Sequence, residues 1–334
     1  MLCQERNIIH SLAQRNDLNR ENVQPVIQIL SKPSGGDGFF QVAIGCGNNP
    51  HIGMARAVVT YALAKGLEVR GLMNIQFAVQ GDDVYILEVN PRASRTVPFV
   101  SKAIGVPLAK LAALVMAGAK LEELGFTKEF VPKHFSVKEA VFPFTRFPGV
   151  DVVLSPEMKS TGEVMGIDDN CGLAYLKSQA AAGSRLPKSG KIFLSVRDED
   201  KDAVMDLARK LKHLGYDLYA TVGTSTALWN AGVKSNAVFR ISRGRPNAID
   251  MIEEGDLVWI VNTPTAGAEP MVDEIRMRAH ATIRGVPVTT TLDGLRWSVS
   301  GLKAYKAANG HIKVRTIQEY HVKSPKVNKW SVKK

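Results

Sequence analysis

Three polar side chains interrupt two apolar segments of the sequence in an arrangement that could bind a cation. Gln76 lies within residues 73–79, and Glu88 and Asn90 lie within residues 84–90. Because alternate residues of a strand share a face, Glu88 and Asn90 leave the same side of an extended chain. Carboxylate and amide oxygens are ligands that Mg²⁺ accepts. The alternative is a set of buried polar groups that form hydrogen bonds with the backbone.

Two arginines follow the second segment and favour the cation site. Arg92 and Arg95 come directly after the Glu-Val-Asn-Pro sequence at residues 88–91. Guanidinium groups form paired hydrogen bonds with phosphate oxygens. Guanidinium groups beside a hard cation are typical of a site that binds a phosphate together with its metal ion.

A β-hairpin is the element that must position these groups. The two segments flank the turn residues 81–83, which predicts antiparallel strands. A register that places Gln76 opposite Glu88 would bring the oxygens together, and both strands are apolar enough to be buried. Gly66 is the predicted C-cap of the helix that precedes the hairpin. Helices are predicted over residues 55–65, 97–104 and 108–117, and a strand over residues 135–142.

From residue 191 onward, short apolar strands alternate with helices that end at glycine. This βαβ pattern predicts a parallel sheet with helices on both faces. The predicted strands are 192–196, 217–221, 238–242, 257–261 and 286–290, and the predicted helices are 201–214, 224–231, 247–254 and 272–284. Residues 167–190 are interpreted as a linker, with a domain boundary near residue 188.

Ligands of parallel sheets bind at the carboxyl ends of the strands. Four polar residues stand at those predicted ends, namely Ser195, Thr221, Asn262 and Thr263. Thr224 opens a helix, where free backbone N–H groups and the helix dipole favour an anion. Lys201, Arg240 and Arg245 add positive charge. Helix capping is the alternative role for the hydroxyl groups.

Composition narrows the class of protein. Of the 334 residues, 45% are hydrophobic and 22% are charged, as in ordinary globular proteins. The formal net charge of +11 comes from scattered basic residues and from five lysines in residues 322–334. No aromatic-basic pattern accompanies them, so we expect anionic small molecules as partners and no nucleic acid.

Cysteine usage and hydropathy indicate a cytoplasmic protein. Cys3, Cys46 and Cys171 have no paired spacing, which argues against a disulfide framework and against a zinc site. No apolar run approaches the roughly 18 residues that span a bilayer, so we expect no membrane association.

Residues 73–102 closely resemble the metal- and nucleotide-binding end of an ATP-grasp domain. The matching sequences are MNIQFAV and YILEVNPRASRTVPFVSK, and the second ATP-grasp unit of the carbamoyl-phosphate synthase large chain is the most similar. Residues 136–139, 147–151 and 156–166 extend the resemblance, which covers about residues 60–321. It implies ATP and Mg²⁺ or Mn²⁺ as cofactors. The implied metal ligands are Gln76, Glu88 and Asn90, of which Gln76 and Glu88 also bind the nucleotide, and the implied catalytic residues are Arg92 and Arg95.

Phosphorylation of carbamate to carbamoyl phosphate, for arginine and pyrimidine synthesis, is the activity that the resemblance implies. The implied partners are a glutaminase small chain and the remainder of the large chain. Residues 1–50 match nothing in the family, and the phosphate lid and adenine pocket that should precede the hairpin are missing. We therefore expect a ligase fragment that is inactive alone. The alternative is a non-catalytic nucleotide-binding regulatory module.

Residues 191–321 resemble the methylglyoxal-synthase-like (MGS-like) regulatory domain of the same family. The resemblance implies an allosteric site for uridine or inosine monophosphate (UMP or IMP), and Glu139 matches a residue implicated in binding ornithine. The other implied allosteric residues are Ser195, Lys201, Thr221, Thr224, Arg240, Asn262 and Thr290. Arg240 replaces a lysine and Pro264 replaces a threonine of the family. Residues 261–265 contain no aspartate, which argues against methylglyoxal synthase catalysis.

The expected fold class is α/β, with a truncated ATP-grasp (α+β) portion followed by a doubly wound parallel-sheet domain. The expected parts are an unassigned segment over 1–50, the ATP-grasp portion over 51–187, the MGS-like allosteric domain over 188–322 and a basic tail over 323–334.

Overall fold

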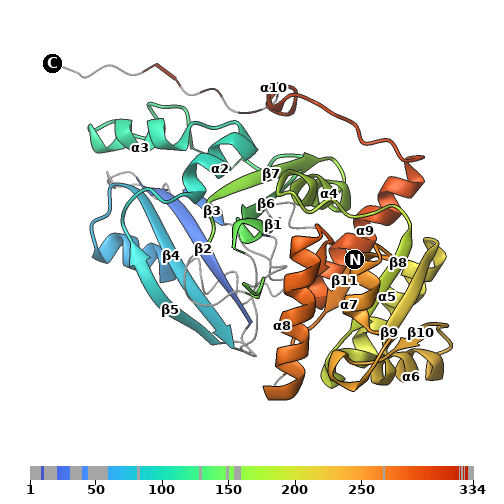
Figure 1. Cartoon of the computed structure of the whole chain (residues 1–334). Coiled ribbons are helices and arrows are strands. Elements are labelled where there is room, and N and C mark those ends of the chain that lie inside the picture. The colour runs from blue at the N-terminus through green and yellow to red at the C-terminus, as the bar shows by residue number, and fades with distance from the viewer. Residues whose placement is uncertain are drawn as a thin grey trace. The chain divides into compact units, whose positions relative to one another are not determined.

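The chain folds into two compact units. The computed structural model describes residues 9–10, 21–30, 40–43, 59–80, 83–127, 130–147, 150–153, 159–265, 268–322, 324, 326, 328 and 329. The first unit contains the described residues up to Ser136 and from Lys313 onward, and the second contains Val137–Ile312 (Figure 1). Most of the predicted segment 1–50, including its glycine cluster at 34–38, and most of the tail 323–334 lie outside the described residues. The four predicted domain bounds stay predictions.

An antiparallel sheet with the strand order β3-β2-β4-β5 forms the centre of the first unit. The predicted hairpin is confirmed, because β4 and β5 are neighbouring antiparallel strands. The strands of this unit are β1 (Ile9–His10), β2 (Glu21–Leu30), β3 (Phe40–Ala43), β4 (Gly71–Gln80) and β5 (Asp83–Asn90). Among the described strands, β5 lies at the edge of this sheet and is hydrogen-bonded to a neighbour on one side only.

A helix over residues 59–66 covers one face of the hairpin. Its Ala64 packs with Met73, Ile75 and Phe77 of β4. The predicted C-cap at Gly66 is wrong, because the left-handed residue is Glu68, with φ 49°. Because the helix ends at this residue, Val69 packs against the same core. The backbone N–H of Val69 donates a hydrogen bond to Ala64 O. The other helices are α2 (Thr96–Ile104), α3 (Leu108–Met116) and α10 (Ile317–Tyr320).

The second unit begins with the neighbouring strands β6 (Phe135–Val141) and β7 (Gly162–Asp168), with the short helix η1 (Phe144–Arg146) after β6. Residues 167–190 are not simply a linker, because they include the end of β7 and the helix α4 (Cys171–Ala181). Asn170 caps this helix by accepting a hydrogen bond from Leu173 N at 3.1 Å. A Cβ on Gly172 would come within 2.7 Å of Gly301 N, so two glycines allow α4 to approach the later helix α9 closely.

The predicted parallel sheet is confirmed. Its strand order is β10-β9-β8-β11-β12, and every pair is parallel. The strands are β8 (Gly190–Ser195), β9 (Tyr216–Thr221), β10 (Asn236–Val238), β11 (Leu257–Asn262) and β12 (Val288–Thr289). The direction of winding reverses between β8 and β11, and such a switch point opens a crevice at the carboxyl ends of the strands.

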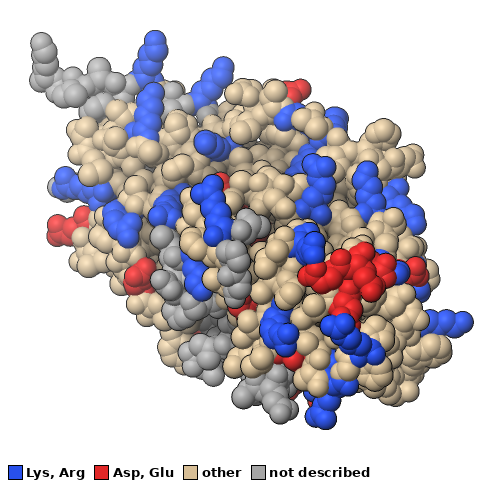
Figure 2. All heavy atoms as spheres, in the orientation of Figure 1, with Lys and Arg blue, Asp and Glu red and all other residues tan. Residues whose placement is uncertain are grey.

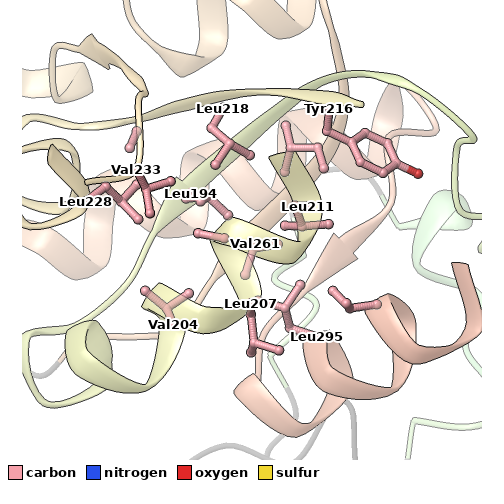
Figure 3. Close-up of a cluster of buried hydrophobic side chains, with 14 of the residues drawn as sticks. Leu194, Val204, Leu207, Leu211, Tyr216, Leu218, Leu228, Val233, Val261 and Leu295 are labelled. Carbon is pink, nitrogen blue, oxygen red and sulfur yellow. The ribbon is translucent and has the colours of Figure 1, made fainter. Parts of the chain in front are cut away.

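Helices cover both faces of this sheet. One core joins β8, β9 and β11 to α5 (Lys201–His213), α6 (Val222–Asn230) and α9 (Leu292–Ala307). Figure 3 shows ten labelled side chains of this core, among them Leu194 of β8, Leu207 of α5 and Leu295 of α9. A second core joins the sheet to α7 (Ala248–Glu253) and α8 (Ala268–Ile283). This arrangement is the doubly wound architecture that the sequence predicted.

Two local predictions in this unit differ from the structure. The strand expected at 238–242 is β10 at 236–238, and residues 241–243 form the short helix η3 (Ile241–Arg243). The Asp273 carboxylate accepts hydrogen bonds from both the backbone and the hydroxyl of Ser242, which holds the chain out of the sheet. The helix α9 was not predicted. A further short helix, η2 (Asp198–Asp200), precedes α5.

None of the described helices has by itself both the length and the apolar content that crossing a bilayer requires. Together α2 and α3 meet that test, but they are bent by 114° relative to each other.

Tyr216 makes the stability of the second unit depend on pH. Burial raises the pKa of Tyr216 from 10.0 to about 12, and its hydroxyl donates a hydrogen bond to Pro187 O at 2.5 Å. Because the folded-state pKa is raised, the stabilisation is complete below pH 10 and is lost as the pH rises towards 12. The free energy of unfolding should fall by about 2 kcal/mol relative to Tyr216→Phe by pH 12. Denaturant titrations of both proteins measure this difference, and parallel pH profiles would contradict it.

Candidate functional site

The hairpin register brings the predicted oxygen ligands together. Gln76 stands opposite Glu88, and Asn74 stands opposite Asn90. Paired residues of antiparallel strands project from the same face, and so do residues two apart in one strand. All four side chains therefore leave one face of the hairpin. Sequence reasoning missed Asn74, although its position two residues before Gln76 placed it on that face.

A β-bulge next to the Gln76–Glu88 pair determines which side chains share that face. The register shifts there, so that Phe77 pairs with Ile86 and Leu87 is the extra residue. Val84 and Val89 of β5 both pack on the core beneath the hairpin, although strict alternation would place them on opposite faces. The bulge therefore separates Glu88 from the apolar face, and bulges often re-aim side chains beside functional sites.

The polar residues of β5 are more exposed than we expected from the apolar residues around them in the sequence. Glu88 is exposed and Asn90 is half-buried. Tyr85, Ile86 and Leu87 are also exposed, to between 45% and 55%. The expectation of a buried strand is wrong for β5, because β5 is an edge strand with one paired side. Because Glu88 is exposed, folding does not remove its carboxylate from water.

Arg92 and Arg95 lie at the exit from β5. Both are exposed, and Arg92 N donates a hydrogen bond to Asn90 O at 2.8 Å, which turns the chain directly after the strand. Arg95 occupies the N-cap position of α2. The described residues contain no group of three His, Cys, Asp or Glu side chains that could hold a metal ion. A cation on this face would therefore need the amide oxygens as well as Glu88.

A second polar set lies at the switch point of the parallel sheet. Asn262, at the end of β11, donates a hydrogen bond from Nδ2 to Ser195 O at 3.0 Å, and Thr263 N donates to the same carbonyl at 3.2 Å. The Thr263 hydroxyl accepts a hydrogen bond from Arg197 N at 3.0 Å. Asn262 and Thr263 are both buried. The ends of β8 and β11 are thus joined by side-chain and backbone hydrogen bonds.

Thr221 and Thr224 surround the start of α6. The Thr224 hydroxyl is buried, accepts a hydrogen bond from Val196 N at 3.4 Å and accepts another from the Thr221 hydroxyl at 3.2 Å. Thr221 is the N-cap residue, but its side chain makes no capping bond. These hydroxyls therefore connect β8, β9 and α6 instead of capping the helix.

Lys201 provides positive charge at the same place. Its Nζ lies 3.4 Å from the position that a Cβ on Gly223 would occupy, in the first turn of α6. Lys201 also forms an ion pair with Asp198 at 2.7 Å. This hydrogen bond lowers the pKa of the Asp198 carboxyl, and the charge of Arg240 adds a smaller effect. Arg240, which is exposed, thus acts on the same carboxylate as Lys201.

Thr290 completes the set of predicted residues at this edge. Thr289 pairs with Val261, so the buried Thr290 follows β12 beside the end of β11. Arg245 is separate from this group, because its exposed side chain forms an ion pair with the half-buried Asp250. Most of the predicted allosteric residues therefore gather at one edge of the sheet.

Glu139 occupies a different place in the second unit. It is buried in β6 and accepts a hydrogen bond from Gln179 Nε2 of α4 at 2.7 Å. Glu139 is therefore not an exposed strand carboxylate. Its neighbour Lys138, which is also buried, forms an ion pair with the exposed Glu163 of β7 at 3.1 Å.

Basic side chains are spread over the face of the molecule in Figure 2 and form no single large patch. The charge of +11 is therefore scattered on this face, as the sequence predicted. The positive side chains near the start of α6, Lys201 and Arg240, contribute only a small part of this charge.

Arg278 is the main residue at this edge that sequence reasoning missed. It is 2% exposed and lies in α8, where its Nη1 donates a hydrogen bond to Asn262 Oδ1 at 2.5 Å. Met277 and Ala281 of the same helix belong to the core, and the helical period, which places Arg278 on their face, was the sequence signal that could have found it.

Two family descriptions match the two parts of the chain. Residues 54–124 match "Carbamoyl-phosphate synthase L chain, ATP binding domain", and residues 203–290 match "MGS-like domain". The first range contains the hairpin, and the second contains most of the parallel sheet. A solved methylglyoxal synthase from Elizabethkingia anophelis NUHP1 is 16% identical and covers 34% of this chain and 80% of its own, with a TM-score of 0.28.

Curated relatives extend this similarity. The carbamoyl phosphate synthase large chain of Myxococcus xanthus (strain DK1622) is 52% identical over 259 residues, which are 78% of this chain and 24% of that protein. The large chain of Archaeoglobus fulgidus is 51% identical over 266 residues, which are 79% of this chain and 24% of that protein. The chain therefore spans about a quarter of the length of these relatives.

Thr224→Val should destabilise the second unit. The substitution keeps the shape of the side chain but leaves Val196 N without its acceptor in the interior, which costs roughly 1–3 kcal/mol. Thr226→Val is the matched control, because Thr226 is exposed on the same helix and bonds only to Val222 O. Thermal and denaturant unfolding measure both effects. Equal losses for the two variants would show that the buried hydroxyl has no special role.

Proposed function

We propose that this chain, a relative of the C-terminal part of carbamoyl phosphate synthase large chains, contributes two sites to such an enzyme. One is the metal end of an ATP-binding site on the hairpin. The other is an allosteric nucleotide site at the edge of the parallel sheet. The similarity to large chains over 78% of this chain supports both assignments.

The observation that carries the allosteric site is the gathering of hydroxyl groups and cations at the start of α6. Lys201 lies beside the first turn of this helix, and Thr221 and Thr224 form its hydroxyl cluster. Free N–H groups at a helix start and a nearby ammonium favour a phosphate. Asn262 and Thr290 lie at the same edge and would meet the rest of a nucleotide such as UMP or IMP. Arg240 keeps the positive charge of the family's lysine there.

The hairpin residues fit a hard cation. Gln76 and Glu88 are directly opposed, Asn90 follows on the same face, and oxygen donors of this kind are typical of Mg²⁺ and Mn²⁺ sites. A cation held there would neutralise phosphate charge during the transfer of the ATP γ-phosphoryl group to carbamate. Arg92 and Arg95 would orient the phosphates from the end of β5 with their guanidinium forks.

We propose that the remaining ATP contacts come from elsewhere in the enzyme. The family's ATP-binding description matches residues 54–124, and the hairpin residues named above would contact only the metal and the phosphates. We therefore propose that phosphoryl transfer requires the rest of a large chain, together with a glutaminase small chain that supplies ammonia. Ornithine is a further proposed effector, and the carboxylate of the buried Glu139 would bind it.

A non-catalytic nucleotide-binding module is the second candidate. It requires only the parallel-sheet region, of which residues 203–290 match the MGS-like family. Residues 261–265 have no aspartate to serve as the catalytic acid or base. Nucleotide binding without any restored ligase activity would favour this candidate.

Lys201→Ala should weaken nucleotide binding. Loss of one charge-assisted hydrogen bond costs roughly 1.5–3 kcal/mol, so the Kd for UMP or IMP should rise about ten- to a hundredfold. Calorimetry measures the Kd, and the melting temperature without ligand should hardly change because Lys201 is not part of the core. Lys210→Ala is the matched control on the same helix, since Lys210 pairs only with Asp206 on the surface. If Lys201→Ala binds UMP and IMP with an unchanged Kd, the phosphate does not bind beside Lys201.

Glu88→Ala should abolish ligase activity when the rest of a large chain and a small chain are supplied in trans. Removing the carboxylate leaves only neutral amide oxygens for the cation, which weakens metal binding. ATP-dependent formation of carbamoyl phosphate is the measurement. Asp83→Ala is the control, because Asp83 is an exposed carboxylate at the other end of β5. If complementation restores activity and Glu88→Ala does not abolish it, the assignment of the metal site to the hairpin is wrong.

A further inference from the structure

A buried guanidinium lies behind the proposed nucleotide site. Arg278 of α8 is 2% exposed and is among the largest side chains that are fully buried. A charge that is removed from water must be paired and hydrogen-bonded, or it strongly destabilises the fold. The partners of Arg278 therefore show what the buried charge does.

Arg278 has carboxylate partners on two segments of the chain. Its Nε and Nη2 donate parallel hydrogen bonds to the two oxygens of Asp151, each at 2.7 Å. Glu274, one turn earlier in α8, lies 3.4 Å from Nη1. The paired geometry with Asp151 fixes the plane of the guanidinium, which a single contact could not do.

The remaining contact of Arg278 determines the orientation of Asn262. Nη1 donates to Asn262 Oδ1 at 2.5 Å, and Asn262 Nδ2 donates to Ser195 O at 3.0 Å. A guanidinium can only donate and a backbone carbonyl can only accept. The opposite orientation of the amide would place donor against donor and acceptor against acceptor. Asn262 therefore has one favourable orientation while Arg278 is in place.

We propose that Arg278 is a positioning residue for the ligand site at the ends of β8 and β11. It acts through Asn262, and its pair with Asp151 ties the site to the segment between η1 and β7. This inference rests on the proposed nucleotide site. Because coupling between two sites is reciprocal, a bound nucleotide should also stabilise the Asp151–Arg278 pair.

Arg278→Lys tests the proposal in the full chain. Lysine keeps the charge but cannot hold Asp151 and Asn262 in one plane. We expect the Kd for UMP and IMP to rise about tenfold, as is typical when one member of a hydrogen-bonded network is replaced. Arg276→Lys is the matched control, because Arg276 is exposed two residues earlier on the same helix. An unchanged Kd for Arg278→Lys would overturn the proposal.

A double-mutant cycle separates positioning from general destabilisation. If Arg278 acts through Asn262, then Arg278→Lys should have no further effect on the Kd in a chain that already carries Asn262→Ala. Additive effects on the Kd would overturn the proposal, because a purely structural role does not require Asn262. Should Arg278→Lys fail to melt cooperatively, Asp151→Asn takes its place in the same cycle, since it keeps the shape of the carboxyl group and the charge of Arg278.

The control separates failure of this inference from failure of the proposed function. If the unsubstituted chain binds neither UMP nor IMP, the nucleotide site itself is wrong, and this inference is wrong with it. If the unsubstituted chain and Arg276→Lys bind equally well and Arg278→Lys does too, only the positioning role fails.

Discussion

The buried charge of Arg278 is the constraint on which the proposed ligand-binding edge of the second unit depends. A guanidinium in the interior must satisfy its donors, and this one does so with Asp151, Glu274 and Asn262. These contacts connect α8 and β11 to the segment after η1, and Asn262 continues to the carbonyl of Ser195 at the end of β8. Removal of any one partner would leave the buried guanidinium with an unsatisfied donor.

The two proposed sites are built by different physical means. The oxygen groups of the hairpin lie at the edge of a sheet, where Glu88 is exposed to solvent. The hydroxyl and amide groups of the parallel sheet are buried and are held in place by one another. In the proposed function, the hairpin would present charge to a cation, whereas the sheet edge would present preorganised donors and acceptors to a polar ligand.

Backbone detail decides which side chains take part. The bulge at Leu87 reverses the alternation of β5, so that Val84 and Val89 pack on the same core while Glu88 projects from the other face. In the second unit, Gly172 and Gly301 allow α4 and α9 to approach closely. Residues that composition suggests are a linker thereby become part of the folded unit.

Local patterns of the sequence determined the hairpin, the parallel sheet and most of the proposed site residues. Strand alternation placed Glu88 and Asn90 on one face, and the glycine-stopped helices predicted the βαβ order, because both signals act between near neighbours in the chain. Only the tertiary structure decided the exposure of β5, the helix at 171–181, the burial of Glu139 and the buried contacts of Arg278. Each of these depends on a partner distant in sequence. Asp151 is 127 residues from Arg278, and no local pattern records which distant carboxylate will meet a buried guanidinium.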